Sequence, residues 1–332
     1  MAAVYDISEF VDWLPEYVQA HRLRGSEPRY RRYCQPEGRD DGTDLDAYGC
    51  ADAANILYTI GLLPREPRVR LQWVAVLQEF QRIEDGVFVN PTHSDEHTTA
   101  HLTAALELFD ARPLHPLHFM EPCKTQEGVD QFLDALNWRS PWEQSHRGAG
   151  VGAAFLITEA VGPEWFDWYF EWLDEQVDPE TGFWRRGMID RDDLFPHLAG
   201  SFHYHFNYVA ARRAIPYPER VIDASLGLML TSGLFHRDGE LGFADIDGVF
   251  CIYRALRQCG HRHDDCMAAL RRTLAAAVKL VTDRGYRESR VFDDIHNTFG
   301  AVCCLAELQQ ALPGELRTPR PLRQVLDRRP FI

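Results

Sequence analysis

Residues 242–260, GFADIDGVFCIYRALRQCG, show the kind of segment that decides the fold of this chain. Apolar side chains recur in it at the spacing of an α-helix, at Phe250, Ile252, Tyr253, Leu256 and Cys259. Two carboxylates, Asp245 and Asp247, stand at the start of the predicted helix. They are either caps of the helix or an acid held over a cavity, and the surrounding helices decide between these interpretations.

Helical periodicity recurs along nearly the whole chain, whereas strand signals are sparse. Proline or glycine marks many of the junctions between the helices. The predicted helices span residues 6–21, 44–62, 66–83, 94–110, 126–137, 142–161, 163–177, 195–213, 217–232, 244–259, 264–283 and 293–312.

Alternate members of this series differ in character. The even-numbered helices are rich in small and apolar residues, as in GAGVGAAFLITEAVG (148–162), whereas the odd-numbered ones carry charged faces, as in PEWFDWYFEWLDEQ (163–176). A helix that is apolar nearly all round is buried, and one with a charged stripe faces water. The alternation predicts an all-α fold, a single (α/α)6 toroid of inner and outer rings over 1–316, followed by a basic, proline-containing tail over 317–332.

Composition excludes several classes of protein. The chain has 332 residues, 45% of them hydrophobic, and a net charge of -15, which argues against a nucleic-acid partner. No apolar run reaches the roughly 20 residues of a transmembrane segment, and the acidic start of the chain is unlike a signal peptide. The eight cysteines are scattered without a CxxC pair. We therefore expect a cytoplasmic protein without a disulfide framework, and its oligomeric state stays open.

The connections that lead into the predicted inner helices are the polar ones. Since inner helices of a toroid run roughly parallel, their starts gather at one end, where we expect a ring of titratable groups above a small-molecule cavity. Each aspartate there has an alternative role as a helix cap, but caps do not explain why histidine recurs in at least four of the six connections. The expected ring comprises Asp44, Asp46, Asp52, His93, Asp95, His97, His146, Arg147, His197, His203, Asp245, Asp247, Asp294 and His296.

Three other kinds of site receive less support. His93, His97 and His101 have the spacing of a shared helix face, but Pro91 and Thr92 place His93 before the helix, so we predict no metal and no cofactor. No G-x-S-x-G elbow or phosphate-binding loop occurs. The GAGVG run at 148–152 follows no strand, which indicates close helix packing.

Two turns resemble the Q-x-G-x-W-type repeats of the terpenoid cyclase and protein prenyltransferase superfamily. They are QEFQRIEDGVF (78–88), which ends in Phe88 where tryptophan is usual, and WLDEQVDPETGFW (172–184). The resemblance implies that Gln176 and Trp184 belong to the scaffold that ties outer helices together. Asp264 and Cys266 spell the Asp-x-Cys zinc pair of the prenyltransferases, but they stand at the start of a predicted outer helix.

The DIDG stretch at 245–248 is similar to the D-x-D-D-T motif of class II terpene cyclases. This resemblance puts Asp247 at the position of the catalytic acid and Asp245 beside it, while Gly248 and Val249 depart from the motif. Two carboxylates so close together at a dry cavity wall do not both ionise easily, so one stays protonated and can serve as a general acid. Aromatic side chains that face inward can stabilise a carbocation through their ring faces.

We therefore predict an enzyme of the class II terpene cyclase type that cyclises an isoprenoid-type substrate. The predicted catalytic residues are Asp247, Asp245 and His203. The predicted substrate contacts are Asp95, His97, His197, Phe202, Tyr204, His205, Tyr208, Asp294, His296 and Trp184.

Two alternatives remain open at this point. Toroids of this kind also host polysaccharide lyases and glycosidases, for which His203, Asn207 and Tyr208 offer polar groups and Trp138, Trp142 and Trp184 offer stacking surfaces. The fold can also serve as a non-catalytic ligand-binding module. For the tail we expect a surface strap, with packing back over the toroid or docking of a partner as alternatives.

Overall fold

The computed structural model describes residues 4–25, 27–35 and 44–332, and each predicted helix is present in it with ends shifted by a few residues. The sequence did not predict the short elements β1 (Tyr5–Asp6), η1 (His118–Lys124), α12 (Arg284–Arg287), η2 (Arg290–Asp293), β2 (Leu316–Arg317) and α14 (Val325–Arg328). β1 pairs in parallel with β2, Tyr5 opposite Leu316. The longer helices are α1 (Ser8–Ala20), α2 (Ala47–Thr59), α3 (Pro67–Gln78), α4 (Asp95–Glu107), α5 (Gln126–Asp134), α6 (Pro141–Thr158), α7 (Pro163–Gln176), α8 (Phe195–Ala210), α9 (Pro218–Leu228), α10 (Phe243–Cys259), α11 (His263–Thr282) and α13 (Ile295–Ala311).

Side-chain caps fix several helix starts. The Asp46 carboxylate accepts the backbone N–H of Gly49 at 2.8 Å, and Asp294 accepts that of His296 at 3.0 Å. Ser94 caps α4 in the same way. The cap interpretation is therefore correct for these two aspartates, because each carboxylate satisfies an amide that has no partner within its own helix.

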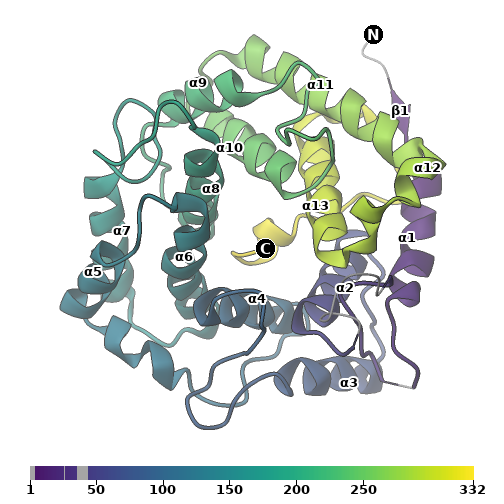
Figure 1. Ribbon diagram of the computed structural model, residues 1–332, viewed down its shortest axis with the longest axis horizontal. Coiled ribbons are helices and arrows are strands. Elements are labelled where there is room, and N and C mark those ends of the chain that lie inside the picture. The colour runs from purple at the N-terminus through teal and green to yellow at the C-terminus, as the bar shows by residue number, and fades with distance from the viewer. Residues whose placement is uncertain (1–3, 26, 36–43) are drawn as a thin grey trace. The chain divides into compact units, whose positions relative to one another are not determined.

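The chain divides into two compact units, which we describe separately. Unit 1 comprises Met1–Leu77, Met229–Phe250 and His263–Val325, and unit 2 comprises Gln78–Leu228, Cys251–Arg262 and Leu326–Ile332. In unit 1, α13 packs against α2 and α11, and α1 also contacts α2 and α11 (Figure 1).

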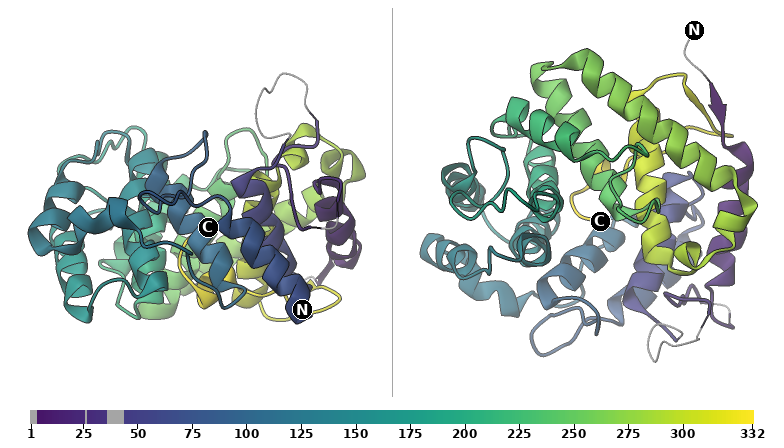
Figure 2. Two further views of the ribbon diagram at one scale, coloured as in Figure 1. Left: turned by 90° about the horizontal axis from the view of Figure 1, so that it is seen from below. Right: turned by 45° about the horizontal axis from the view of Figure 1, so that its top comes forward.

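In unit 2, α4, α6 and α8 lie side by side in chain order, and α5 packs against α7 (Figures 1 and 2). Small residues permit this close packing. A Cβ atom added at Gly200 would lie 2.7 Å from the backbone oxygen of Pro141, and one at Gly150 would lie 2.8 Å from that of Glu96. The glycine-rich run in α6 therefore serves helix packing, as its sequence context indicated.

Burial follows the predicted alternation. Nearly every residue of α2, α4, α8 and α13 is buried, whereas α3 buries only Trp73, Val76 and Leu77. Among the described residues, no helix combines the length and the apolar character needed to cross a bilayer.

The last part of the tail is buried against unit 2. The Phe331 ring lies 4.8 Å from the His97 ring and 5.5 Å from the Phe206 ring, measured between centroids. Arg329 donates through Nε to the backbone oxygen of Ala104 at 3.1 Å. Residues 326–332 therefore pack back onto α4 and α8, and for them the expected surface strap is wrong, because Phe331 and Ile332 supply apolar area that burial stabilises.

Candidate active site

Three turns are tied to the buried helices that follow them by one repeated hydrogen bond. The backbone N–H of Phe88 donates to Thr99 Oγ1 at 3.1 Å, and that of Trp184 donates to Ser201 Oγ at 3.1 Å. In the third turn the backbone N–H of Phe235 donates to Asp245 Oδ1 at 2.8 Å. Each donor follows a glycine by two residues, and these glycines, Gly86, Gly182 and Gly233, have positive φ angles of 79°, 73° and 89°.

Asp245 thus holds a structural position that hydroxyl side chains occupy in the other two turns. Its second oxygen accepts the backbone N–H of Gly242 at 3.1 Å, so the carboxylate also caps the start of α10. Burial raises the pKa of Asp245 to about 6, although the backbone amides of Phe235 and Gly242 favour its charged form. We call this hydrogen bond from the turn to the helix the tether. Since the hydroxyls of Thr99 and Ser201 accept the tether in the other two turns, the difference at Asp245 is that the acceptor can carry a negative charge.

Asp247, two residues further on, has no such structural role. Its side chain is buried, and its Oδ2 atom makes no hydrogen bond within the part of the chain that the structure describes. Burial, and after it the charge of Asp245, raises the pKa of Asp247 well above its usual range. Both effects favour the neutral form of the carboxyl group, which is the form a general acid needs.

Gly248 stands where the D-x-D-D motif has its last aspartate, and the structure gives a steric reason for the glycine. A Cβ atom built on Gly248 would lie 2.4 Å from carbons of the Phe235 ring, so the ring fills the space of a side chain at this position. The same turn that binds Asp245 through its backbone thus excludes the last acid of the D-x-D-D pattern.

The tether also defines equivalent positions on different helices. Two residues after Thr99, Ser201 and Asp245 come His101, His203 and Asp247. Sequence reasoning missed this equivalence, because the donor and acceptor of the tether are 11, 17 and 10 residues apart. Only the Gly-x-aromatic triplets at 86–88, 182–184 and 233–235 could have indicated it.

His203, in the middle of α8, lies among histidines from α6 and from the start of α4. Its ring centroid is 4.9 Å from that of His146, and the His97 ring lies 4.4 Å from His146 and 4.8 Å from His93. Burial and the neighbouring rings lower the pKa values of His97 and His203 well below the usual range. Four histidines of the expected ring, His93, His97, His146 and His203, therefore lie close together where α4, α6 and α8 pack.

Hydrogen bonds assign the tautomer of His203. Ser145 Oγ lies 2.5 Å from the backbone oxygen of Trp142, which only accepts, so the hydroxyl donates its proton there. Towards His203 Nδ1, at 2.9 Å, the same hydroxyl then accepts. Nδ1 therefore carries the hydrogen, and Nε2 of the neutral ring is the basic nitrogen.

The other predicted contacts on α8 mostly have structural partners. Tyr208 Oη donates to Asp174 Oδ1 at 2.6 Å, and the Tyr204 ring stacks on Trp138 at 5.8 Å. His205 Nδ1 lies 3.4 Å from Cys251 Sγ. Phe202 is buried beside His203 and Phe206. These contacts hold Tyr204 and Tyr208 against neighbouring helices and loops.

Trp184 and His197 are joined in the second glycine turn. Trp184 Nε1 donates to the backbone oxygen of Leu173 at 2.8 Å. His197 Nδ1 donates to the backbone oxygen of Trp184 at 2.9 Å, and its Nε2 accepts the N–H of Asp190 at 2.9 Å. Both ring nitrogens of His197 are thus engaged within the scaffold. The scaffold role implied for Trp184 by its motif agrees with these contacts.

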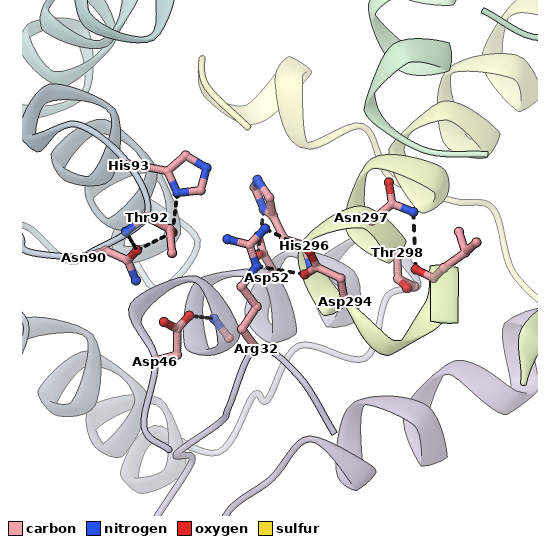
Figure 3. A network of polar contacts seen from close by, with 12 residues as sticks. Arg32, Asp46, Asp52, Asn90, Thr92, His93, Asp294, His296, Asn297 and Thr298 are labelled. Carbon is pink, nitrogen blue, oxygen red and sulfur yellow. Dashed lines mark hydrogen bonds and ion pairs between the residues drawn. The ribbon is translucent and has the colours of Figure 1, made fainter. Parts of the chain in front are cut away.

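The remaining predicted residues lie at the starts of α4 and α13. Asp95 is exposed in the first turn of α4. In unit 1, His296 Nδ1 lies 2.9 Å from Asp52 Oδ2, and Arg32 binds both oxygens of Asp294 at 2.9 and 2.8 Å (Figure 3). Asp294 is thereby both a cap and an ion-pair partner, and Asp52 fixes the orientation of the His296 ring.

A pocket of about 430 Å³ opens at the start of α6. This volume lies within the range of small-molecule sites. Its lining residues are Arg139, Ser140, Pro141, Trp142, Glu143, His146 and Pro196.

No protein-family model and no curated protein matches this sequence. Two solved structures of the type II terpene cyclase MstE from Scytonema resemble it, each at 14% identity over 92% of this chain and 99% of theirs. One is an aspartate-to-asparagine variant in complex with the substrate geranylgeranyl dihydroxybenzoate, with a TM-score of 0.50, and the other is a ligand-free tyrosine-to-phenylalanine variant, with a TM-score of 0.53. The chain shares the fold of these cyclases, so the predicted all-α toroid fold is confirmed.

Proposed function

We propose that this chain is a class II terpene cyclase-like enzyme in which Asp247 protonates an isoprenoid-type substrate. The observation that carries the proposal is the placement of Asp247, a buried carboxyl group two residues from that of Asp245, whose Oδ2 atom receives no hydrogen bond from the described residues. The fold shared with type II terpene cyclases, one of them in complex with a geranylgeranyl compound, supports a prenyl chain as the substrate.

In the proposed first step, the Asp247 hydroxyl gives its proton to the terminal carbon–carbon double bond or epoxide of the chain. With an alkene, the π electrons form the new C–H bond and leave a tertiary carbocation, which internal double bonds then attack to close rings. The product step releases a proton from a carbon next to the last cation, and that C–H electron pair becomes a double bond. Burial beside Asp245 disfavours the Asp247 carboxylate, which favours both proton delivery and later reprotonation.

His203 is the proposed acceptor of the released proton. Its neutral ring presents Nε2 as the basic nitrogen, because Ser145 fixes the hydrogen on Nδ1. His203 stands two residues after the hydroxyl of Ser201 that accepts the turn's N–H, as Asp247 stands two residues after Asp245. Phe202 and Phe206 lie beside the His203 ring and offer aromatic faces suited to a cationic intermediate.

The test is turnover of geranylgeranyl dihydroxybenzoate and of simpler geranylgeranyl compounds by the wild type, Asp247→Asn and Asp264→Asn. Asp264 is an exposed carboxylate at the start of α11 and serves as the matched control. We expect Asp247→Asn to lower turnover at least about 1,000-fold while its circular dichroism and melting temperature stay near those of the wild type. Wild-type turnover by folded Asp247→Asn would overturn the proposal.

A further inference from the structure

A basic surface lies at the turn from α2 to α3, in a chain whose net charge is -15. Residues 58–71 and 318–323 together hold five arginines and one glutamate, so their formal charge is +4, five minus one. Both segments belong to unit 1, and the proposed proton chemistry uses neither of them. We call this surface the arginine patch, and its cationic residues are Arg65, Arg68, Arg70, Arg320 and Arg323.

Hydrogen bonds and a ring contact hold the two segments of the arginine patch together. The backbone N–H of Arg323 donates to the backbone oxygen of Thr59 at 2.8 Å, and the Arg323 guanidinium lies 5.5 Å from the centroid of the Tyr58 ring. Arg320 donates through Nη1 to the backbone oxygen of Ile60 at 3.2 Å. The two arginines of the tail segment are therefore fixed beside the end of α2.

The positive charge of the arginine patch exceeds that of its acidic groups. Glu66, the one acidic residue of the two segments, accepts the backbone N–H groups of Arg68 and Val69 at 3.0 and 2.7 Å, so its carboxylate caps α3. Within the ranges 4–25, 27–35 and 44–332, no ion pair is formed by the guanidinium groups of Arg65, Arg68, Arg320 and Arg323. Their charge therefore stays available to an anionic partner.

Two exposed leucines accompany these arginines. Leu71 is 68% exposed and follows Arg68 by three residues, so the two side chains share one face of α3. Leu62 is 41% exposed and follows Gly61, where an added Cβ atom would lie 3.3 Å from Cδ of Arg320. Single exposed leucines are common in proteins, and what distinguishes this surface is that each leucine has an arginine close to it.

This combination matches the chemistry of an anionic lipid surface. Arginine side chains bind the phosphate groups of such a surface, while leucine side chains bury apolar area between the head groups. A nucleic acid or an acidic peptide would engage the arginines but would offer no apolar layer to the leucines. We propose that the arginine patch binds the surface of an anionic lipid bilayer. The inference is independent of the proposed function, since it involves neither Asp247 nor His203.

The experiment measures co-sedimentation of the full chain with two kinds of vesicle, phosphatidylcholine alone and an equal mixture of phosphatidylcholine and phosphatidylglycerol. Polyglutamate and a double-stranded oligonucleotide serve as soluble competitors. The test variants are Arg65→Gln/Arg68→Gln, which removes two charges from the patch, and Leu71→Ser.

Matched controls come from a surface of unit 2 whose arginines are paired. Arg82 pairs with Asp85 and Arg112 pairs with Glu107, so Arg82→Gln/Arg112→Gln makes the same change in net charge outside the patch. Ile83 is 71% exposed, and Ile83→Ser is the control for Leu71→Ser.

We expect the wild type to bind the mixed vesicles at least about tenfold more tightly than phosphatidylcholine vesicles, and salt to weaken this binding. Arg65→Gln/Arg68→Gln should weaken binding at least about tenfold and Leu71→Ser at least about threefold, whereas the controls should change it less than about twofold. All variants should keep melting temperatures near that of the wild type. Equal binding to both kinds of vesicle, or equal losses in test and control variants, would overturn the inference. Tighter binding to either competitor than to the mixed vesicles would also overturn it. Since the assay needs no turnover, a failure of the cyclase proposal leaves this result unchanged.

Discussion

Phe235 is connected to the start of α10 in two ways, because its backbone N–H binds Asp245 Oδ1 at 2.8 Å and its ring fills the space beside Gly248. Asp247 stands between these two contacts. The turn therefore separates the roles of two carboxylates that the sequence presents as a pair: Asp245 is held by backbone amides, and the Asp247 Oδ2 atom receives no hydrogen bond from the described residues.

A serine should replace the structural role of Asp245, and an alanine should not. Thr99 and Ser201 accept the same tether in the other turns, so Asp245→Ser keeps an acceptor for the Phe235 N–H, while Asp245→Ala leaves that buried N–H unpaired. We expect Asp245→Ala to be about 1–3 kcal/mol less stable than Asp245→Ser at pH 5. Urea denaturation of the two variants measures this difference, and equal stabilities would contradict the tether.

The same serine variant should change the pH profile of turnover. In the proposed mechanism only protonated Asp247 is active, so we expect full activity below the folded pKa of Asp247 and loss of activity as pH rises through that pKa. The charge of Asp245 raises this pKa, so its removal should move the alkaline limb of the kcat profile to lower pH. Asp264→Asn should leave the limb in place. A limb that stays unchanged in Asp245→Ser would show that burial alone sets the acidity of Asp247.

Adding a side chain at Gly248 should destabilise the protein, even where the new residue is the aspartate of the D-x-D-D motif. A Cβ there would meet the Phe235 ring at 2.4 Å, so we expect Gly248→Ala to lower stability by about 1–3 kcal/mol, and Gly248→Asp by more. Phe235→Ala should make room for the new methyl group. In a double-mutant cycle, the loss in Gly248→Ala/Phe235→Ala should be smaller than the sum of the single losses, and strict additivity would count against this contact.

Gln81 should prove to be a scaffold residue of the first glycine turn. Its side chain donates to the backbone oxygens of Gly86 and His115 at 3.0 and 2.7 Å and accepts the N–H of His115 at 2.9 Å. We expect Gln81→Ala to lower the free energy of unfolding by about 1–3 kcal/mol, since partly buried polar groups lose their partners. Gln131→Ala, on the exposed face of α5, should change it by less than about 0.5 kcal/mol.

Buried histidines should make the fold sensitive to acid. Burial lowers the pKa of His205 to about 3, so between pH 6.5 and about 3 the unfolded chain binds a proton that the folded chain does not. Stability therefore falls with falling pH in this window, by up to about 1.4 kcal/mol per pH unit for this group. His205→Gln should reduce the slope of stability against pH by about one proton. Burial lowers the pKa of His21 to about 4, so His21 should act in the same way. If the slope of stability against pH were the same in His205→Gln as in the wild type, His205 would not be a source of the acid sensitivity.

The sequence determined the helices and their burial, because helix formation and amphipathicity depend on neighbours three and four residues apart. The predicted helix at 142–161 is α6, Pro141–Thr158, and its small residues indicated close packing that Gly150 and Gly200 confirm. Capping is also local, so the role of Asp46 could be predicted from its place before α2. The fold class follows from these local signals repeated along the chain.

The roles of the polar side chains depended on contacts that no local pattern encodes. The sequence grouped Tyr208 and His203 as contacts of one cavity, but Tyr208 donates to Asp174 on α7, while His203 meets Ser145 and His146 on α6. The amide that binds Asp245 lies ten residues away in an irregular turn. Only tertiary structure decided that Asp245 binds backbone amides and that the Oδ2 atom of Asp247 receives no hydrogen bond from the described residues. Desolvation and hydrogen bonding are set by the atoms that packing brings together.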